Sequence, residues 1–254
     1  MDLLRDPRRR VAVVVAGVVV LALTGSLLTL AAIRGVLPGT ADCTATLGDR
    51  AVDLSTEQAE GAASIAARAV RLRVPLTTTT TALADVLDSS EGDARVVAAA
   101  LTGRSRHALT CTHGGSADED SDRLDRSGLT HRAAVVRRDL NRAFGPQKVG
   151  GFAPGGVSTG HQGGSAHYEG RAVDVFFRPI SRAQKVRGWA MAQYLVAQAA
   201  RLNVRTVIFD NRIWTSGWRS ADGWRSYDPD TSGRDAPTKA ILEHRDHVHV
   251  DVYE

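Results

Sequence analysis

The chain has 254 residues, a length that allows one domain or two small ones. Its hydrophobic content of 43% is typical of a globular protein, and 32 Lys and Arg against 28 Asp and Glu give a formal net charge of +4. The basic residues are scattered and are not interleaved with aromatic residues, which argues against nucleic-acid binding. A mildly cationic exterior suits an anionic cell envelope better.

The N-terminal segment 11–33 is apolar and contains no charged residue. As a helix it would be about 34 Å long, enough to cross the hydrocarbon core of a bilayer. Four arginines lie between residues 5 and 10, whereas only Arg34 follows the run closely. This bias predicts a cytoplasmic N-terminus, and no A-x-A cleavage site follows the run. We therefore predict that residues 1–34 form a cytoplasmic tip and a transmembrane signal-anchor, which makes the protein single-pass in the cell membrane.

Residues 35–112 are predicted to form a small helical extracytoplasmic segment, with a connector up to residue 53. The sequence Ser55-Thr-Glu-Gln58 resembles a capping box, and the apolar stripe that follows must end before Pro75. Two more helices are expected near 82–87 and 93–101. No catalytic constellation is evident in this segment.

Cys43 and Cys111 are the two cysteines of the chain, and both follow the predicted anchor. Disulfides persist in oxidising compartments, so a Cys43–Cys111 bridge is predicted, with two unpaired thiols as the alternative. Residues 113–130 are acidic and polar and are interpreted as a linker. They lack the spacing and central glycine of a calcium-binding loop.

Residues 131–254 are predicted to form a mixed domain, which makes the overall fold class α+β. Helices are expected at 131–144 and 181–202, and strands at 171–177, 204–210 and 246–253. The glycine-rich stretch 149–164 lacks a phosphate-loop pattern and is interpreted as an irregular wall around a cleft. The loop 216–239 is long enough to be functional or mobile.

Two motifs carry the chemistry: Ser165-Ala-His167-Tyr-Glu-Gly170-Arg-Ala-Val-Asp174 and His244-Arg-Asp246-His247-Val-His249. Alternate side chains of a strand share a face, so His247 and His249 point the same way. If strands 171–177 and 246–253 are neighbours, Asp174 and His249 converge and His167 reaches in from the preceding loop. Two imidazoles and one carboxylate, with a fourth position open, are typical of catalytic zinc. Judged on spacing alone, a solvated histidine-rich edge is as good an interpretation as a metal site. The isolated His161 is interpreted as a surface or hydrogen-bonded residue.

The two motifs resemble those of the zinc D-alanyl-D-alanine peptidase group, which shares the hedgehog/DD-peptidase fold. The forms Ser-Ala-His-x-x-Gly-Arg-Ala-x-Asp and His-x-Asp-His-Val-His-Val are closest to an actinobacterial secreted C-terminal domain related to peptidase family M15. This resemblance covers about residues 131–254. It implies a domain with a small antiparallel sheet and flanking helices.

The resemblance also implies roles for individual residues. His167, Asp174 and His249 match the zinc ligands of the group. The remaining matches are His247 beside the metal-bound water, His244 as an additional active-site histidine and Ser165 as a substrate contact. In the carboxypeptidase branch a glutamate acts as the base, and the matching position here is Asp246. The alternation of side chains along the strand turns Asp246 away from the metal, so His247 is preferred as the base. Arg171 is a candidate for the substrate carboxylate by proximity only.

These observations predict a membrane-anchored zinc metallopeptidase that hydrolyses amide bonds in peptidoglycan stem peptides or cross-links. The alternative is a non-catalytic, metal-stapled module that binds the cell envelope, and metal sequestration or transport ranks third. The sequence leaves open whether cleavage is of the carboxypeptidase or endopeptidase type, and it leaves the oligomeric state open.

Overall fold

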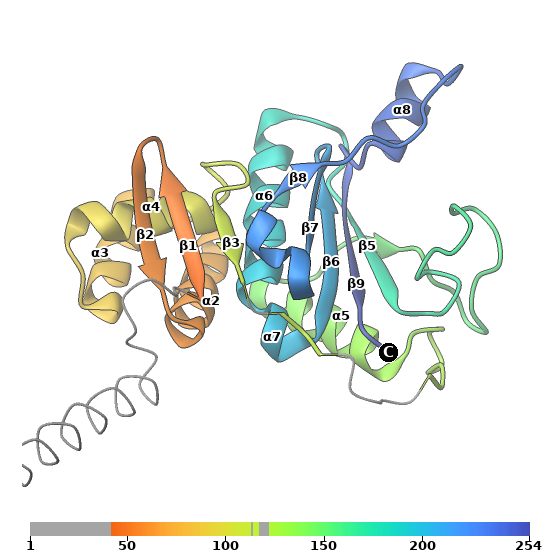
Figure 1. The fold of residues 1–254 in the computed structure, drawn as a ribbon, viewed down its shortest axis with the longest axis horizontal. Helices are drawn as coiled ribbons and strands as arrows, with labels where there is room; N and C mark the ends of the chain where they lie inside the picture. Colours follow the sequence, from red (N-terminus) through yellow and green to blue (C-terminus); the bar gives the residue numbers. More distant parts are fainter. Residues whose placement is uncertain (1–41, 113, 117–121) are drawn as a thin grey trace, which may run out of the picture. The chain divides into compact units, whose positions relative to one another are not determined.

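The computed structural model of the protein describes residues 42–112, 114–116 and 122–254 (Figure 1). The chain divides into two units, Met1–Thr40 and Ala41–Glu254, and all the described residues belong to the second unit. Its first part contains β1 (Cys43–Leu47), β2 (Arg50–Leu54), α2 (Thr56–Leu72), α3 (Leu76–Leu87), α4 (Glu91–Leu101) and β3 (Leu109–Cys111). The rest contains α5 (His131–Phe144), β4 (Val149–Gly150), β5 (Ala172–Phe176), α6 (Arg182–Ala197), α7 (Ala199–Leu202), β6 (Val204–Phe209), β7 (Arg212–Thr215), η1 (Gly217–Asp222), β8 (Arg225–Ser226), α8 (Ala236–Leu242) and β9 (His247–Val252).

The structure corrects the predicted fold class and the predicted localisation. Segment 11–33, on which the transmembrane helix, the membrane contact and the single-pass topology rested, lies outside the described residues. Among the described residues, no helix is both long and apolar enough to cross a bilayer. Helix α2, with 17 residues, is shorter than the roughly 20 that a bilayer requires and carries charged residues along its length. The architecture of residues 42–112, 114–116 and 122–254 is α+β, with antiparallel sheets and helices, none of which could cross a bilayer.

The segment that was predicted to be helical also contains a three-stranded sheet of order β2-β1-β3. Strands β1 and β2 form a hairpin in which Leu47 pairs with Arg50, so that Gly48 and Asp49 make a two-residue turn. Gly48 has a φ of 59°, the left-handed conformation that such turns require. The hairpin occupies most of the stretch that the sequence suggested was a connector.

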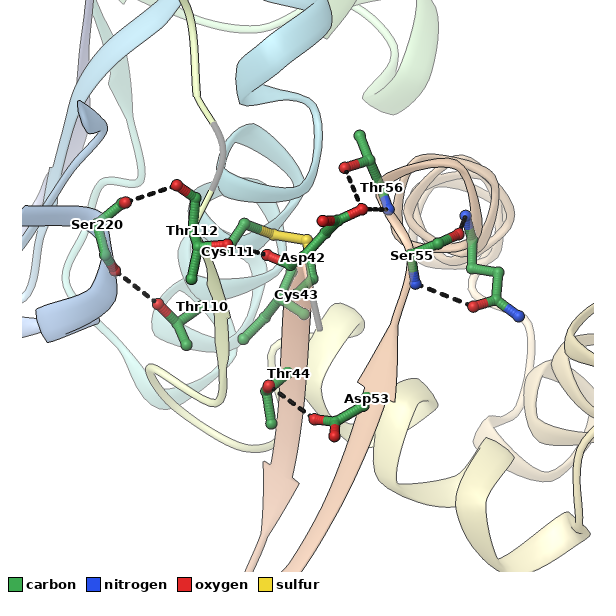
Figure 2. Close-up of a disulfide and its surroundings, with 12 residues drawn as sticks. Asp42, Cys43, Thr44, Asp53, Ser55, Thr56, Thr110, Cys111, Thr112 and Ser220 are labelled. Carbon is green, nitrogen blue, oxygen red and sulfur yellow. Dashed lines mark hydrogen bonds between the residues drawn. A yellow bond between two sulfur atoms is a disulfide. The ribbon is translucent and has the colours of Figure 1, made fainter. Parts of the chain in front are cut away.

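The Cys43–Cys111 disulfide is confirmed, with an S–S distance of 2.06 Å (Figure 2). The two cysteines are directly opposite each other on β1 and β3. A bridge that closes a loop of 68 residues stabilises the fold by about 4 kcal/mol in the chain-entropy model. Figure 2 also shows Ser220 of η1 against β3, where its hydroxyl donates to the carbonyl of Thr112 at 2.7 Å. The predicted loop 216–239 therefore contains a short helix, η1, which is hydrogen-bonded to the chain next to the disulfide-linked sheet.

Helix α6 joins the two parts of the described unit. Its Gln193 has no exposed surface and bonds four backbone groups of the segment 100–109. The side-chain amide donates to the carbonyls of Ala100 and Ser105, and its oxygen accepts from the amides of Ala108 and Leu109. A continuous hydrophobic core runs through both parts, from β1 to β9.

The larger sheet has six antiparallel strands in the order β4-β5-β9-β6-β7-β8. The three predicted strands are found as β5, β6 and β9, and they are adjacent in the sheet, as Figure 1 shows. One face of these strands buries valines in the core, toward α6. These valines are Val173, Val175, Val204, Val207, Val248, Val250 and Val252. Because side chains alternate along a strand, the opposite face is left for polar residues.

Candidate metal centre

The polar face of the sheet brings the two sequence motifs together. In the β5–β9 ladder Asp174 is directly opposite His249, Phe176 is opposite His247, and Ala172 is opposite Asp251. Residues that are paired across an antiparallel ladder lie on the same face. The alternation argument is therefore confirmed in its geometry, including the strand adjacency that periodicity could not supply.

Three donor atoms form a small, nearly equilateral triangle on this face. His167 Nε2 lies 3.0 Å from His249 Nδ1 and 3.2 Å from Asp174 Oδ1. His249 Nδ1 lies 3.1 Å from Asp174 Oδ1. Around a tetrahedral zinc ion with bonds of about 2.0–2.1 Å, neighbouring donors are about 3.3 Å apart. The triangle thus has nearly the dimensions of one face of a zinc coordination tetrahedron.

The other ring nitrogens of the two histidines have acceptors of their own. His167 Nδ1 lies 2.8 Å from the carbonyl of Gly151, and His249 Nε2 lies 3.3 Å from Asp251 Oδ2. With the proton of each neutral ring on its outer nitrogen, the inner nitrogens can present lone pairs to a metal ion. Three such donors about 3 Å apart require a cation among them, which is either a metal ion or a proton on one of the inner nitrogens. Carbonyl and carboxylate partners of this kind orient the histidine ligands of metal sites.

Gly151, in the glycine-rich stretch before the first motif, lies directly against the His167 ring. Its φ is 82°, and a Cβ at this position would lie 2.2 Å from His167 Cε1. Only glycine therefore allows the backbone to approach the ring closely enough to accept its proton.

Electrostatics at the triangle favour positive charge. Burial raises the pKa of Asp174, but the hydrogen bonds with His167 and His249 outweigh burial and hold it far below its ordinary value. Burial lowers the pKa of His249, but Asp174 and Asp251 outweigh this effect and raise the pKa to about 9. The centre thus contains an ionised carboxylate and attracts a cation, either a proton or a metal ion.

His247 lies at the edge of the triangle and is oriented by Asp246. Its Nδ1 is 2.7 Å from Asp246 Oδ1, and its Nε2 is 3.8 Å from Asp174 Oδ1. Asp246 also accepts a hydrogen bond from Arg178 Nε at 2.6 Å. Burial raises the pKa of Asp246, but His247 and Arg178 bring it below its ordinary value. Asp246, the second choice for the base, therefore faces the far side of the His247 ring rather than the triangle.

His244 packs against His247, with ring centroids 4.5 Å apart. Burial and the positive charges of His247 and His249 lower its pKa to about 3. Its Nδ1 lies 3.0 Å from the carbonyl of Leu242, which leaves Nε2 as an acceptor. His244 is a neutral residue of the site at neutral pH.

The two predicted substrate contacts lie on a cavity of about 570 Å³ that also exposes the triangle and His247. The Ser165 hydroxyl accepts a bond from the backbone amide of His167 at 3.4 Å. Arg171 is buried and already engaged, because its guanidinium bonds Glu169, Glu254 and the carbonyl of Val252. Its charge is thus largely neutralised within the fold.

Sequence reasoning missed Arg205, which lines the same cavity. Val204 pairs with Val252 and Thr206 with Asp251, so Arg205 is the extra residue of a β-bulge. A bulge re-aims a side chain, and Arg205 is exposed at the cavity although the alternation of β6 would turn it toward the core. Within the described part of the chain, its guanidinium forms no ion pair. No periodicity in the sequence indicates a bulge.

The structure places His161 beside the triangle. Its ring stacks on that of His167, with centroids 3.9 Å apart. One ligand atom each from His161, His167 and Asp174 lie within 4.8 Å of one another, so His161 is within reach of the same centre. The Tyr168 hydroxyl accepts a bond from the His161 backbone amide at 3.0 Å and fixes the glycine-rich loop there. Burial and the charge of His167 lower the His161 pKa.

Comparison with known proteins yields one family. A family model described as VldE, C-terminal domain, matches residues 125–240. The match includes His167 and Asp174 and ends before His249. No curated protein and no solved structure matches the chain.

Proposed function

We propose that the protein is a zinc-dependent peptidase that hydrolyses amide bonds in peptidoglycan peptides. The observation that supports this most directly is the triangle of His167, Asp174 and His249, in which each donor is about 3 Å from the other two. Two imidazoles and a carboxylate are a ligand set of catalytic zinc sites. The peptidoglycan substrate follows from the resemblance of the two motifs to the zinc D-alanyl-D-alanine peptidases.

The residues around the triangle suit amide hydrolysis. When bound, the zinc ion supplies Lewis-acid activation of water and of the scissile carbonyl. His247 can accept the proton of the attacking water at Nε2, because Asp246 holds the other ring nitrogen as the donor. The same nitrogen can then return the proton to the leaving amine. The Asp246–Arg178 ion pair keeps that carboxylate ionised, so that it stabilises the imidazolium between the two transfers.

Arg205 is the better candidate for binding a terminal carboxylate of the substrate, in place of Arg171. It is exposed at the cavity, whereas the Arg171 guanidinium already has two carboxylate partners. A guanidinium binds a carboxylate through two parallel hydrogen bonds, which fixes both the position and the direction of the peptide. This arrangement favours cleavage near a free C-terminus.

The test is a digestion of purified muropeptides by the zinc-loaded full chain, with new amine ends detected by mass spectrometry. We expect new amines from the parent chain and none from His249→Ala. His107→Ala serves as a control, because His107 is exposed and lies outside the cavity at the triangle. If the parent chain binds one zinc ion and releases no amine from any muropeptide, the peptidase proposal is wrong.

A non-catalytic, metal-stapled envelope-binding module is the second candidate, and His161 is the observation that favours it. A fourth protein ligand from His161 would close the position that a substrate carbonyl or water needs. In that case His161→Ala lowers zinc affinity and the parent chain releases no amines. In the peptidase, His161→Ala retains its zinc.

A further inference from the structure

A second concave surface lies away from the metal centre, and we call it the basic groove. It has a volume of about 900 Å³ and is formed by the end of α2, the turn to α3, the loop after α4 and the first turns of α6. Its charged lining residues are Arg71, Arg73, Arg104, Arg106, Arg182, Lys185 and Arg187. None of its lining residues is Asp or Glu.

The concentration of charge is unusual for this chain. The formal net charge of all 254 residues is +4, so the seven cations of the groove exceed it and the remainder of the chain is net negative. Like charges at close range destabilise a fold. A groove that collects them without acids is suited to an anionic ligand.

Four of the cations have no counterion among the residues that the structure describes. Arg73, Arg104, Arg182 and Arg187 are exposed, and their side chains form no ion pair or hydrogen bond within the described part of the chain. The other three are engaged elsewhere: Arg71 donates to the carbonyl of Arg142, and Arg106 and Lys185 contact Asp210.

A close backbone contact brings part of this cluster together. Gly103 has a φ of 73°, and a Cβ there would lie 2.0 Å from the carbonyl oxygen of Val186. The loop that carries Arg104 is thus in close contact with α6, which carries Arg182 and Arg187. The N-terminus of this 16-residue helix adds the positive end of its dipole to the same surface.

We propose that the basic groove binds a flexible polyanion whose charges are phosphate groups and which carries no bases. Guanidinium groups match phosphate oxygens with paired hydrogen bonds. The aromatic residues of the lining, Phe144 and Trp189, are 8% and 1% exposed and cannot act as stacking platforms for bases. The groove is therefore expected to bind its ligand through electrostatic contacts with a chain of repeating phosphate groups.

This proposal is independent of the peptidase activity. The groove shares no lining residue with the cavity at the metal centre. Loss of polyanion binding with intact hydrolysis, or the reverse, therefore separates the failure of one proposal from the failure of the other.

The experiment measures binding of labelled linear inorganic polyphosphate to the full chain by fluorescence anisotropy at several salt concentrations. The test variant replaces the four unpaired arginines with glutamine: Arg73, Arg104, Arg182 and Arg187. A control variant carries the same replacement at four exposed arginines outside the groove: Arg95, Arg126, Arg138 and Arg234. Both variants have the same net charge.

We expect the groove variant to bind polyphosphate more than about tenfold more weakly than the parent, and the control variant to bind like the parent. With about 0.7 ions released per contact on a flexible strand, four lost contacts lower the slope of log affinity against log salt by about three. Equal losses in both variants, or no binding by the parent chain, would overturn the proposal. Tighter binding of an oligothymidylate of the same charge would also overturn it, because bases would then be recognised.

Discussion

Asp251 offers a sharp test of the zinc centre because it is not a proposed ligand itself but contacts the proposed ligand His249. Its Oδ2 lies 3.3 Å from His249 Nε2, and the residue is 8% exposed. The substitution Asp251→Asn keeps the shape of the side chain and removes its negative charge. His249 then loses a charged partner that fixes its tautomer and raises its basicity as a ligand.

Loss of such a partner costs about 10- to 100-fold in metal affinity, which corresponds to about 1.4–2.7 kcal/mol. The affinity is measured by competition between the full chain and a chromogenic chelator for zinc. Asp53→Asn is the matched control, since Asp53 is exposed and, among the described residues, its side chain bonds only Thr44 on the hairpin. An Asp251→Asn variant that binds zinc as tightly as the parent would refute the assignment of His249 Nδ1 as a ligand atom.

Further outcomes are expected for the neighbours of the triangle. Asp246→Asn should retain zinc and lower kcat by about a hundredfold or more, because the histidine it orients loses its fixed tautomer; an unchanged kcat would contradict that role. Arg205→Ala should raise KM by about tenfold or more for peptides with a free C-terminal carboxylate and leave amidated peptides unaffected, as steady-state kinetics would show. In the zinc-free protein, the pKa of His244 is about 3 in the folded state and near 6.5 in the unfolded state. As the pH falls, His244 is therefore protonated in the unfolded chain before it is protonated in the folded chain. Stability should therefore fall as the pH drops from about 6.5 toward 3, and His244→Gln should flatten this part of the curve in urea unfolding experiments.

Much of the centre was predictable because it depends on strand periodicity. Alternation alone placed His247 and His249 on one face of a strand and the valines that alternate with them on the other. Their pairing with Asp174 could not be derived in this way, because contact between strands about 70 residues apart depends on the packing of the whole sheet. The ladder supplies that contact by pairing Asp174 with His249.

Other features are invisible to periodicity for identifiable reasons. Arg205 reaches the cavity through a bulge, which local alternation contradicts. His161 lies in an irregular loop whose path depends on glycine conformations and on the Tyr168 hydroxyl. The β1–β2 hairpin was missed because its strands have five residues each and only the Gly48-Asp49 turn marks it. Short strands carry too few alternations to stand out from a connector.

Zinc content after dialysis is the most direct test of the triangle, measured by elemental analysis on the full chain and on two single variants. The structure predicts one zinc ion per parent chain, its loss in His249→Ala and its retention in His161→Ala. A parent chain without stoichiometric zinc, or a His249→Ala variant that keeps its full complement, would contradict a centre built from His167, Asp174 and His249.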